Sequence, residues 1–189
     1  MLDDKTLLGI LTIIIGVLSY MLYFFGIFEC KTKPDPYSWL IWGVLATIAF
    51  FAQSASGGGA GAWATALTAA VCLIIAMVSY ARYEGKIKKV DIISLVGALL
   101  AIVIWRLTED PLWAVIMAIV IGGIGFIPTF QKIFRKPREE TATTYLLNGI
   151  KFGVALLALG SLTPVTWLYP AALAFMNVSL AATIFLRRM

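Results

Sequence analysis

The sequence predicts an all-α integral membrane protein with seven transmembrane helices, arranged as two parallel three-helix bundles joined by a linker helix. Three observations support this prediction: the composition, seven apolar segments and an internal repeat. Hydrophobic residues make up 61% of the 189 residues and charged residues 13%, and the mean hydropathy is +0.93. A chain of this composition has too little polar surface to cover a soluble globule of its size.

Seven apolar segments each approach the roughly 20 residues that a helix needs to cross the bilayer core. They cover approximately residues 6–28, 37–54, 62–81, 90–107, 112–130, 142–160 and 164–186. The first segment follows the acidic pair Asp3 and Asp4 and lacks a small-residue cleavage site, so we interpret it as a membrane helix and not a signal peptide. Pro34 and Pro36 precede the second segment. Residues 54–61, SASGGGAG, predict a flexible turn before the third segment.

The later segments carry similar start signals. The fourth segment has no counterpart in the repeat described below, so we interpret it as the linker helix. Asp110 followed by Pro111 is typical of a cap and first helical turn, and predicts the start of the fifth segment. Residues 141–144 can cap the sixth segment after a charged stretch, and Pro164 opens the seventh.

The internal repeat relates the two halves of the chain. Residues 10–52 match residues 116–158 without a gap at a constant spacing of 106, and the match pairs Gly16 with Gly122 and Gly43 with Gly149. Internal duplication in a membrane protein is typical of transporters. Because one unmatched helix separates the two triplets, they should run parallel in the membrane. The predicted units are a first bundle at residues 1–83, a linker helix at 84–110 and a second bundle at 111–189.

Basic residues gather on one side of the predicted topology. If the connections alternate between sides, twelve Lys and Arg residues lie on one side, and only Lys5 and Arg106 lie on the other. The twelve are Lys31, Lys33, Arg82, Lys86, Lys88, Lys89, Lys132, Arg135, Lys136, Arg138, Arg187 and Arg188. The positive-inside rule then predicts a multi-pass protein of the cell inner (plasma) membrane with its N-terminus outside and its C-terminus in the cytoplasm. The net charge of +5 follows from this topology, and we expect no nucleic-acid partner.

One stretch resembles a known transporter family. The segment IPTFQKIFRKPREETATTYLLNG, from Ile127 to Gly149, is similar to the SWEET and SemiSWEET (PQ-loop, MtN3-like) superfamily of small-solute carriers. The resemblance implies a 3+1+3 fold whose triplets rock against each other about a proline in the first helix of each triplet. Pro128 fits that hinge, although Thr129 follows it where the family has glutamine. Leu22 and Tyr23 occupy the matching positions of the first half, so only the second half has the hinge, and Pro128 could instead bend a static helix.

Lys151 is the least expected residue of the apolar segments. It lies near the middle of the sixth segment, about nine residues from either end, which is too deep for an easy snorkel to the interface. Asn148 lies three residues earlier and should share its helical face. The pair predicts a subsite for solutes with a carboxylate, a phosphate or dense acceptor oxygens. The alternative is a structural lysine bound to backbone carbonyls.

Further candidates come from the resemblance and from aromatic residues. The resemblance implies a solute-binding asparagine on the third helix of each triplet; Asn177 fits that position, whereas its first-half counterpart is Leu73. The deeper aromatic residues Tyr20, Tyr23, Trp42 and Phe152 are candidates for the cavity wall. The remaining aromatic residues are expected in interfacial belts. They are Trp39, Trp63, Trp105, Trp113, Trp167, Tyr37 and Tyr169.

The apolar segments lack the groups of ion-coupled transport and of catalysis. No Asp or Glu lies deep in a segment and the chain has no His, so we expect an uncoupled facilitator, although a lysine could carry a proton. No metal-ligand cluster, nucleophile-and-base pair or phosphate loop is found, so we expect no enzyme, metal or cofactor. The prediction is alternating-access transport of a small polar solute, sugar-like or anionic, by a chain that contacts the lipid bilayer and could form a homo-oligomer. The alternative is a non-transporting seven-helix receptor or binding protein, as the KDEL receptor is on a similar plan.

Overall fold

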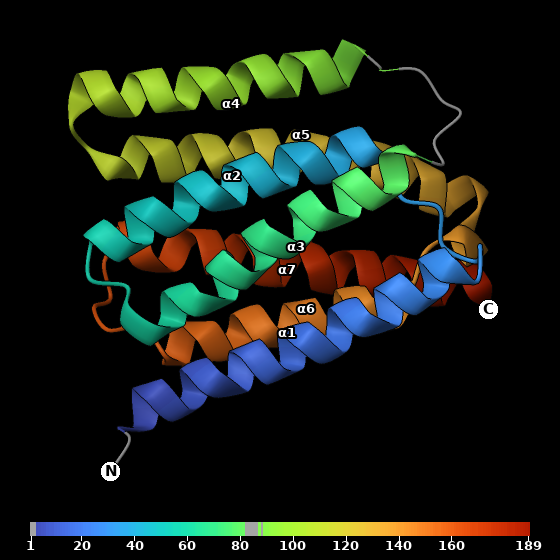
Figure 1. Ribbon diagram of the computed structural model, residues 1–189, viewed down its shortest axis with the longest axis horizontal. Coiled ribbons are helices and arrows are strands. Elements are labelled where there is room, and N and C mark those ends of the chain that lie inside the picture. The colour runs from blue at the N-terminus through green and yellow to red at the C-terminus, as the bar shows by residue number, and fades with distance from the viewer. Residues whose placement is uncertain (1–2, 82–86, 88) are drawn as a thin grey trace.

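The computed structural model describes residues 3–81, 87 and 89–189, and this part of the chain is all helical (Figure 1). The α-helices are α1 (Asp4–Phe28), α2 (Pro36–Ala55), α3 (Trp63–Tyr80), α4 (Lys89–Thr108), α5 (Pro111–Arg135), α6 (Ala142–Leu157) and α7 (Pro164–Arg188), with short 3-10 helices η1 (Gly59–Ala62) and η2 (Pro137–Glu139). Six of these helices, all except α6, are long and apolar enough to cross a membrane. The prediction of a multi-pass, all-α membrane protein is confirmed at this level.

Aspartate caps begin several helices. The Asp35 carboxylate accepts a hydrogen bond from the Tyr37 amide at 3.1 Å, and the Asp110 carboxylate accepts one from the Leu112 amide at 2.9 Å. A proline stands in the first turn of α2, α5 and α7, where a backbone amide would have no acceptor within the helix. Thr141 is the N-cap residue of α6, as predicted, but its hydroxyl makes no cap bond and instead pairs with the hydroxyl of Thr32 at 2.7 Å.

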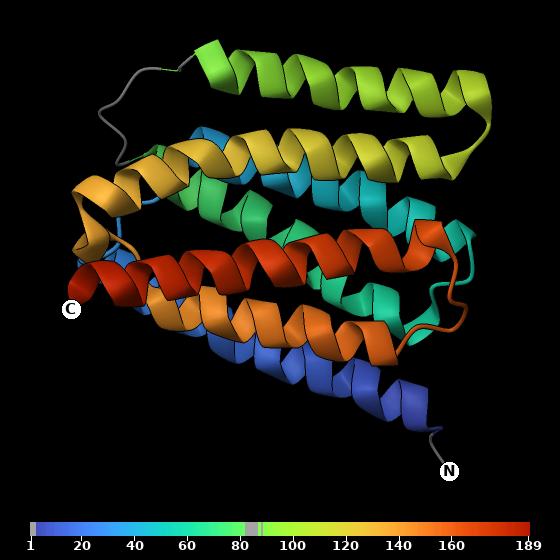
Figure 2. The same ribbon diagram turned by 180° about the vertical axis from the view of Figure 1, so that it is seen from behind.

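Helices α1–α3 and helices α5–α7 form two sets with matching contacts. Helix α3 contacts both α1 and α2, and α7 contacts both α5 and α6. The two sets meet where α1 packs against α6 and α2 packs against α5. Helix α4 packs against α5 and α2 at one edge of the bundle, as Figures 1 and 2 show from opposite sides.

Large apolar side chains cover much of the outer surface. In α4, Ile93 is 64% exposed and Leu107 is 79% exposed, and α1 exposes Ile14 and Phe25 by more than half. A soluble monomer does not leave contiguous apolar surface of this kind open to water. These faces are the surface that contacts lipid.

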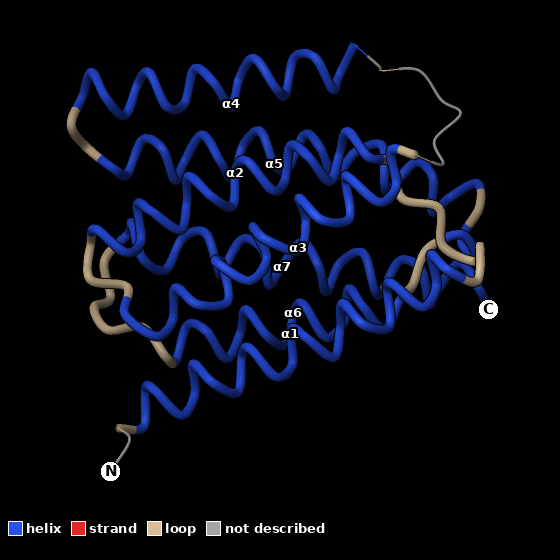
Figure 3. Tube along the Cα trace, viewed as in Figure 1, coloured by secondary structure: helices blue, strands red, loops and turns tan. Residues whose placement is uncertain are grey.

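The described loops gather at two ends of the bundle (Figure 3). At one end, which we call the basic end, Lys132 donates to the carbonyl of Lys33, and Arg188 donates to the carbonyl of Pro137 at 3.0 Å. The predicted basic residues Arg82, Lys86 and Lys88 lie outside the described residues, as does the predicted boundary between residues 83 and 84.

The opposite end is closed by two loops that hydrogen-bond to each other. The Gly160 amide donates to the Gly58 carbonyl at 3.1 Å, and the Ser161 amide donates to the Gly57 carbonyl at 2.9 Å. Gly57 has a φ of 79°, a conformation that favours glycine. The turn predicted at residues 54–61 is shorter in the structure, because α2 continues to Ala55 and η1 begins at Gly59, and backbone bonds to the facing loop hold the link between them.

Candidate functional site

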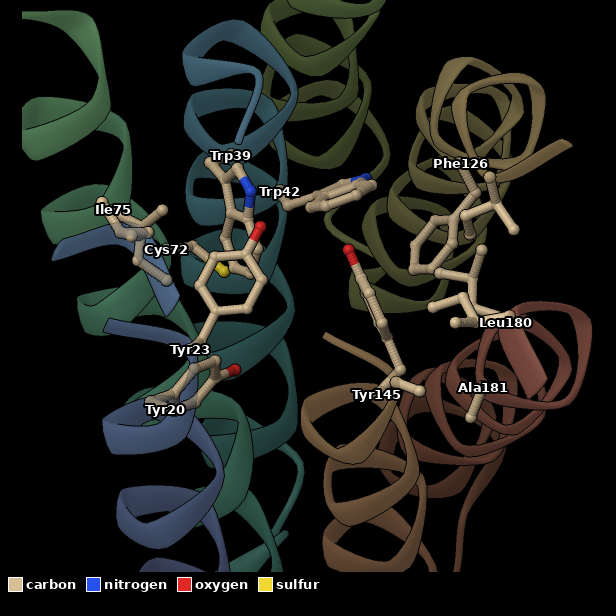
Figure 4. Close-up of a cluster of buried hydrophobic side chains, with 14 of the residues drawn as sticks. Tyr20, Tyr23, Trp39, Trp42, Cys72, Ile75, Phe126, Tyr145, Leu180 and Ala181 are labelled. Carbon is tan, nitrogen blue, oxygen red and sulfur yellow. The ribbon is translucent and has the colours of Figure 1, made fainter. Parts of the chain in front are cut away.

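A central cavity lies between the two sets of helices. Side chains from α1, α2, α3, α5, α6 and α7 line it, and none of the described side chains of α4 does. Its volume is about 40 Å³, a few times the 10–15 Å³ that one water molecule needs. Most of the large lining side chains are aromatic, and several of them point into the same space from α1, α2, α5 and α6 (Figure 4).

The structure brings most of the predicted site residues together at this cavity. Tyr20, Trp42, Asn148, Phe152 and Asn177 line it. They come from four helices and from both halves of the repeat. Lys151 and Tyr23 lie behind the wall, and Pro128 lies at a second cavity described below.

Lys151 is fully buried directly behind the cavity wall. Its ammonium donates to the Thr68 hydroxyl at 2.7 Å and to the Tyr20 hydroxyl at 3.3 Å. The Nζ atom also lies 4.8 Å from the ring centre of Tyr20 and 4.4 Å from that of Phe152. Within the described part of the chain, no carboxylate forms an ion pair with this ammonium. A buried cation with only hydroxyl and ring partners leaves its charge largely uncompensated.

Two features of Lys151 differ from the sequence prediction. Helix α6 ends at Leu157 and not near residue 160, so the lysine lies six residues from that end of the helix. Asn148 lines the cavity, whereas Lys151 does not line it beside Asn148. Instead, Thr68 connects the ammonium to the wall, and its own proton goes to the Ala64 carbonyl at 2.8 Å.

The two asparagines of the cavity differ in what they can offer a solute. The Asn177 amide nitrogen already donates to the Leu173 carbonyl, one turn earlier in α7, at 2.8 Å. The Asn148 side chain is 4% exposed, and its carbonyl oxygen has no hydrogen-bond partner among the described residues. Asn148 therefore holds a buried, unpaired acceptor beside the cavity, which a donor group on a solute would satisfy once the wall around it opens.

Aromatic residues form a continuous contact chain on the basic-end side of the cavity. Tyr23 packs on Trp39 with ring centres 4.9 Å apart, Trp39 packs on Trp42 at 5.4 Å, and Trp42 packs on Phe126 at 4.6 Å (Figure 4). Tyr23 was predicted to line the cavity and does not. Trp39 was predicted at a membrane interface but is buried at the cavity. The interfacial prediction is likewise wrong for Tyr169, which is 3% exposed and lines the same cavity.

A second cavity lies between the central cavity and the basic end. Its volume is about 160 Å³, and Pro128, Thr129, Lys132 and Glu140 contribute to its wall. Pro128 is inside α5, at the level of this cavity. A second helix-interior proline, Pro170, occurs in α7.

Glu140 is a site residue that the sequence does not single out, as are Thr68 and Tyr145. It is 4% exposed and forms an ion pair with Lys132 at 2.7 Å. In the sequence it belongs to the charged run of residues 135–140, which looks like a solvated loop. No signal in that run separates Glu140 from Glu139, which is 24% exposed.

The described residues contain no group of His, Cys, Asp and Glu side chains that could hold a metal ion. Comparison with protein-family models, with curated proteins and with solved structures finds no match to this chain. The chemistry of the cavities and their surroundings is therefore the basis for a functional proposal.

Proposed function

We propose that this protein is a membrane carrier that moves a small polar solute by alternating access between two parallel three-helix bundles. The bundles are α1–α3 and α5–α7, with α4 as the linker of a SWEET-like 3+1+3 plan. Two facts support this arrangement: the repeat at a spacing of 106 residues, and the matching helix contacts within each triplet. Exchange of the two triplets turns the α1–α6 contact into the α5–α2 contact, as a two-fold relation requires.

The central cavity is the observation that carries the proposal. It lies where the two triplets meet, and both ends of the bundle are closed by contacts between loops. The cavity combines aromatic faces with the unpaired oxygen of Asn148, a combination suited to orienting a small polar solute. In its present volume it holds only a few water molecules, so a solute enters when the triplets move apart.

The charges around the cavity favour uncoupled transport of a sugar-like or anionic solute. Among the described residues, no carboxylate lines the central cavity, and Lys151 places a positive charge directly behind the hydroxyls of Tyr20 and Thr68. The Thr68 proton already goes to the Ala64 carbonyl, so the Tyr20 hydroxyl, whose bond to Thr68 Oγ1 is 3.3 Å long, is the group that would turn its proton toward an acceptor oxygen of the solute, polarised by the ammonium. We assign no enzymatic step and no cofactor to this site.

The basic end supports an orientation in the plasma membrane. Arg187 donates to the Phe134 carbonyl at 3.0 Å, so the C-terminus and the α5–α6 loop share that end with Lys33 and Lys132. The positive-inside rule assigns this end to the cytoplasm and the N-terminus to the outside.

Uptake into liposomes tests the proposal. Purified protein is reconstituted and tested with sugars, organic acids, amino acids and vitamins as labelled solutes. We expect saturable uptake of at least one solute, with altered selectivity or rate in Lys151→Met. Lys31→Met is the matched control, because Lys31 is 73% exposed and pairs with Glu29 at the surface, and it should leave uptake unchanged. Vesicles that stay tight to the whole panel would remove the carrier assignment.

A binding protein without transport is the second candidate. The observation that favours it is the unequal distribution of helix-interior prolines, since Pro128 and Pro170 both lie in the second triplet and the helices of the first have none. A hinge in one triplet alone suits a change of shape on ligand binding. The required result is a solute that raises the thermal stability of the purified protein and does not cross the liposome membrane.

A further inference from the structure

The two cavities adjoin each other at Trp39 and Tyr145. These two side chains line both the central cavity and the second cavity. Trp39 is 5% exposed and Tyr145 is 3% exposed. A solute that moves from the central cavity toward the basic end has to pass between or around these two rings, which we call the aromatic partition.

Glu140 fixes one ring of the aromatic partition directly and the other through a neighbour. Its carboxylate oxygen Oε2 accepts hydrogen bonds from the hydroxyl of Tyr145 at 3.0 Å and from the hydroxyl of Tyr23 at 3.4 Å. Tyr23 in turn packs on the ring of Trp39. One carboxylate therefore ties α1 and α6 together at the level of the partition.

The other oxygen of Glu140 ties the same point to α5. Oε1 accepts a hydrogen bond from the Lys132 ammonium at 2.7 Å. Lys132 also donates to the carbonyl of Lys33 in the α1–α2 loop and to the Glu139 carbonyl at 3.4 Å. The ion pair is largely shielded, since Lys132 is 23% exposed and Glu140 4%, and shielding from water strengthens such a pair.

The loop that carries Glu140 is itself held to both triplets. The Arg188 side chain of α7 donates to the Glu140 carbonyl, and the Lys33 amide donates to the Glu139 carbonyl at 3.3 Å. Movement of one triplet against the other at the basic end would have to break or re-form these bonds.

We propose that Glu140 is the latch of a gate that closes the central cavity toward the basic end, with Trp39 and Tyr145 as the closing rings. Glu140 acts as a positioning residue, since it holds the rings in place and does not line the central cavity. Its role in transport rests on the proposed carrier function, whereas the closure itself can be measured without any flux.

A native thiol reports on this closure. Cys72 lines the central cavity and is 2% exposed, and the other cysteine, Cys30, is exposed. In a Cys30→Ser background, the rate at which a small membrane-impermeant maleimide modifies Cys72 measures access to the cavity. The experiment uses full-length protein in proteoliposomes, with orientation scored by protease cleavage of a tag at the C-terminus.

Removing the charge of Glu140 should open the gate. In Glu140→Gln we expect Cys72 to react about tenfold faster or more when the basic end faces the reagent, the shift that follows from losing one charge-assisted hydrogen bond. Tyr145→Phe keeps the ring and removes only its bond to Glu140, so it should change the rate in the same direction by a smaller factor. It also provides a test if Glu140→Gln fails to fold.

Glu139→Gln is the matched control. Glu139 lies in the same loop and pairs at the surface with Lys33 at 3.7 Å and Lys136 at 3.4 Å, but it lines neither cavity. Its neutralisation should leave the Cys72 rate unchanged. An equal acceleration in this control, access only from the opposite end, or an unchanged rate in both Glu140→Gln and Tyr145→Phe would each overturn the latch.

Cys72 labelling and solute uptake together distinguish failure of the latch proposal from failure of the carrier proposal. Faster Cys72 labelling in a protein that passes no solute would keep the latch and remove the carrier. Solute uptake by a protein whose Cys72 rate ignores Glu140→Gln would keep the carrier and remove the latch.

Discussion

The stability of the Lys151→Met variant tests whether the Lys151 ammonium serves solute recognition or holds the structure together. The side chain is 0% exposed, and among the described residues its polar partners are the hydroxyls of Thr68 and Tyr20. Methionine keeps a stem of similar length and removes the charge. The variant loses two hydrogen bonds to a charged group, each worth about 1.5–3 kcal/mol. It also escapes a desolvation penalty of several kcal/mol, because no carboxylate of the described residues pairs with the buried ammonium.

These opposing contributions predict that the free energy of unfolding of Lys151→Met stays within about 2 kcal/mol of wild type, with a tendency toward greater stability. No buried donor is left unpaired, since Thr68 still donates to the Ala64 carbonyl. Lys151→Ala also deletes the stem next to the buried ring of Phe152, and the resulting cavity should cost about 2–5 kcal/mol. The expected order of stability is therefore methionine at or above lysine, and lysine above alanine.

Unfolding by SDS titration in mixed micelles, supported by thermal melts, measures this order. Lys31→Met serves as the surface control and should lie within about 0.5 kcal/mol of wild type. A loss of more than about 3 kcal/mol in Lys151→Met, or a loss equal to that of the alanine variant, would refute the reasoning. The ammonium would then be a structural anchor for Tyr20 and Thr68, and its assignment to solute recognition would fall.

Two further predictions concern helix packing and the hinge. A Cβ atom at Gly16 would lie 2.5 Å from Leu67 Cδ2, so Gly16→Ala should lose up to about 2 kcal/mol of stability, an overpacking cost of about 1–3 kcal/mol partly offset by better helix propensity. Gly153 has no neighbouring atom within 4 Å of that position, so Gly153→Ala should gain about 0.5–1 kcal/mol in the same melts; equal shifts would contradict the packing. Pro128→Ala restores a helical amide donor inside α5 and should stabilise the protein by up to about 3 kcal/mol while slowing solute uptake at unchanged affinity. Pro111→Ala, in the first turn of the same helix, should change neither quantity, and uptake by Pro128→Ala at the wild-type rate would argue for a static bend.

The helices could be predicted from the sequence, but the faces that they present could not. Composition and capping residues located seven helices, because crossing a bilayer and starting a helix both need local signals. Which face of a helix meets lipid has no such local signal, because lipid and the protein interior are both apolar and select the same residue types. Trp39 and Trp113 look alike in the sequence, yet Trp39 is 5% exposed at the central cavity and Trp113 is 49% exposed on the outside.

Site residues could be predicted where a charged or strongly polar side chain stands in an otherwise apolar segment. Lys151 is conspicuous because a charge in an apolar segment is expensive. Its partner Thr68 gives no such signal, because threonine is common in membrane helices and commonly bonds its own backbone. Glu140 gives none either, because its neighbours in the sequence are charged and only the packing of α1, α5, α6 and α7 around it buries it.

Because helix α6 is short, non-helical backbone follows it at a depth where the bilayer core would otherwise surround a helix. At 1.5 Å per residue the 16 residues of α6 reach about 24 Å, less than the roughly 30 Å thickness of the hydrocarbon core. The repeat pairs residue 158 with residue 52, which lies inside α2, whereas α6 ends at Leu157, so the chain leaves its helix in the second half at a level where the first half is still helical. Backbone without a helix inside a bilayer needs other partners for its polar groups. The bonds from Gly160 and Ser161 to Gly58 and Gly57 provide them, so this loop pair can lie below the membrane surface and shorten the path from that side to the centre of the protein.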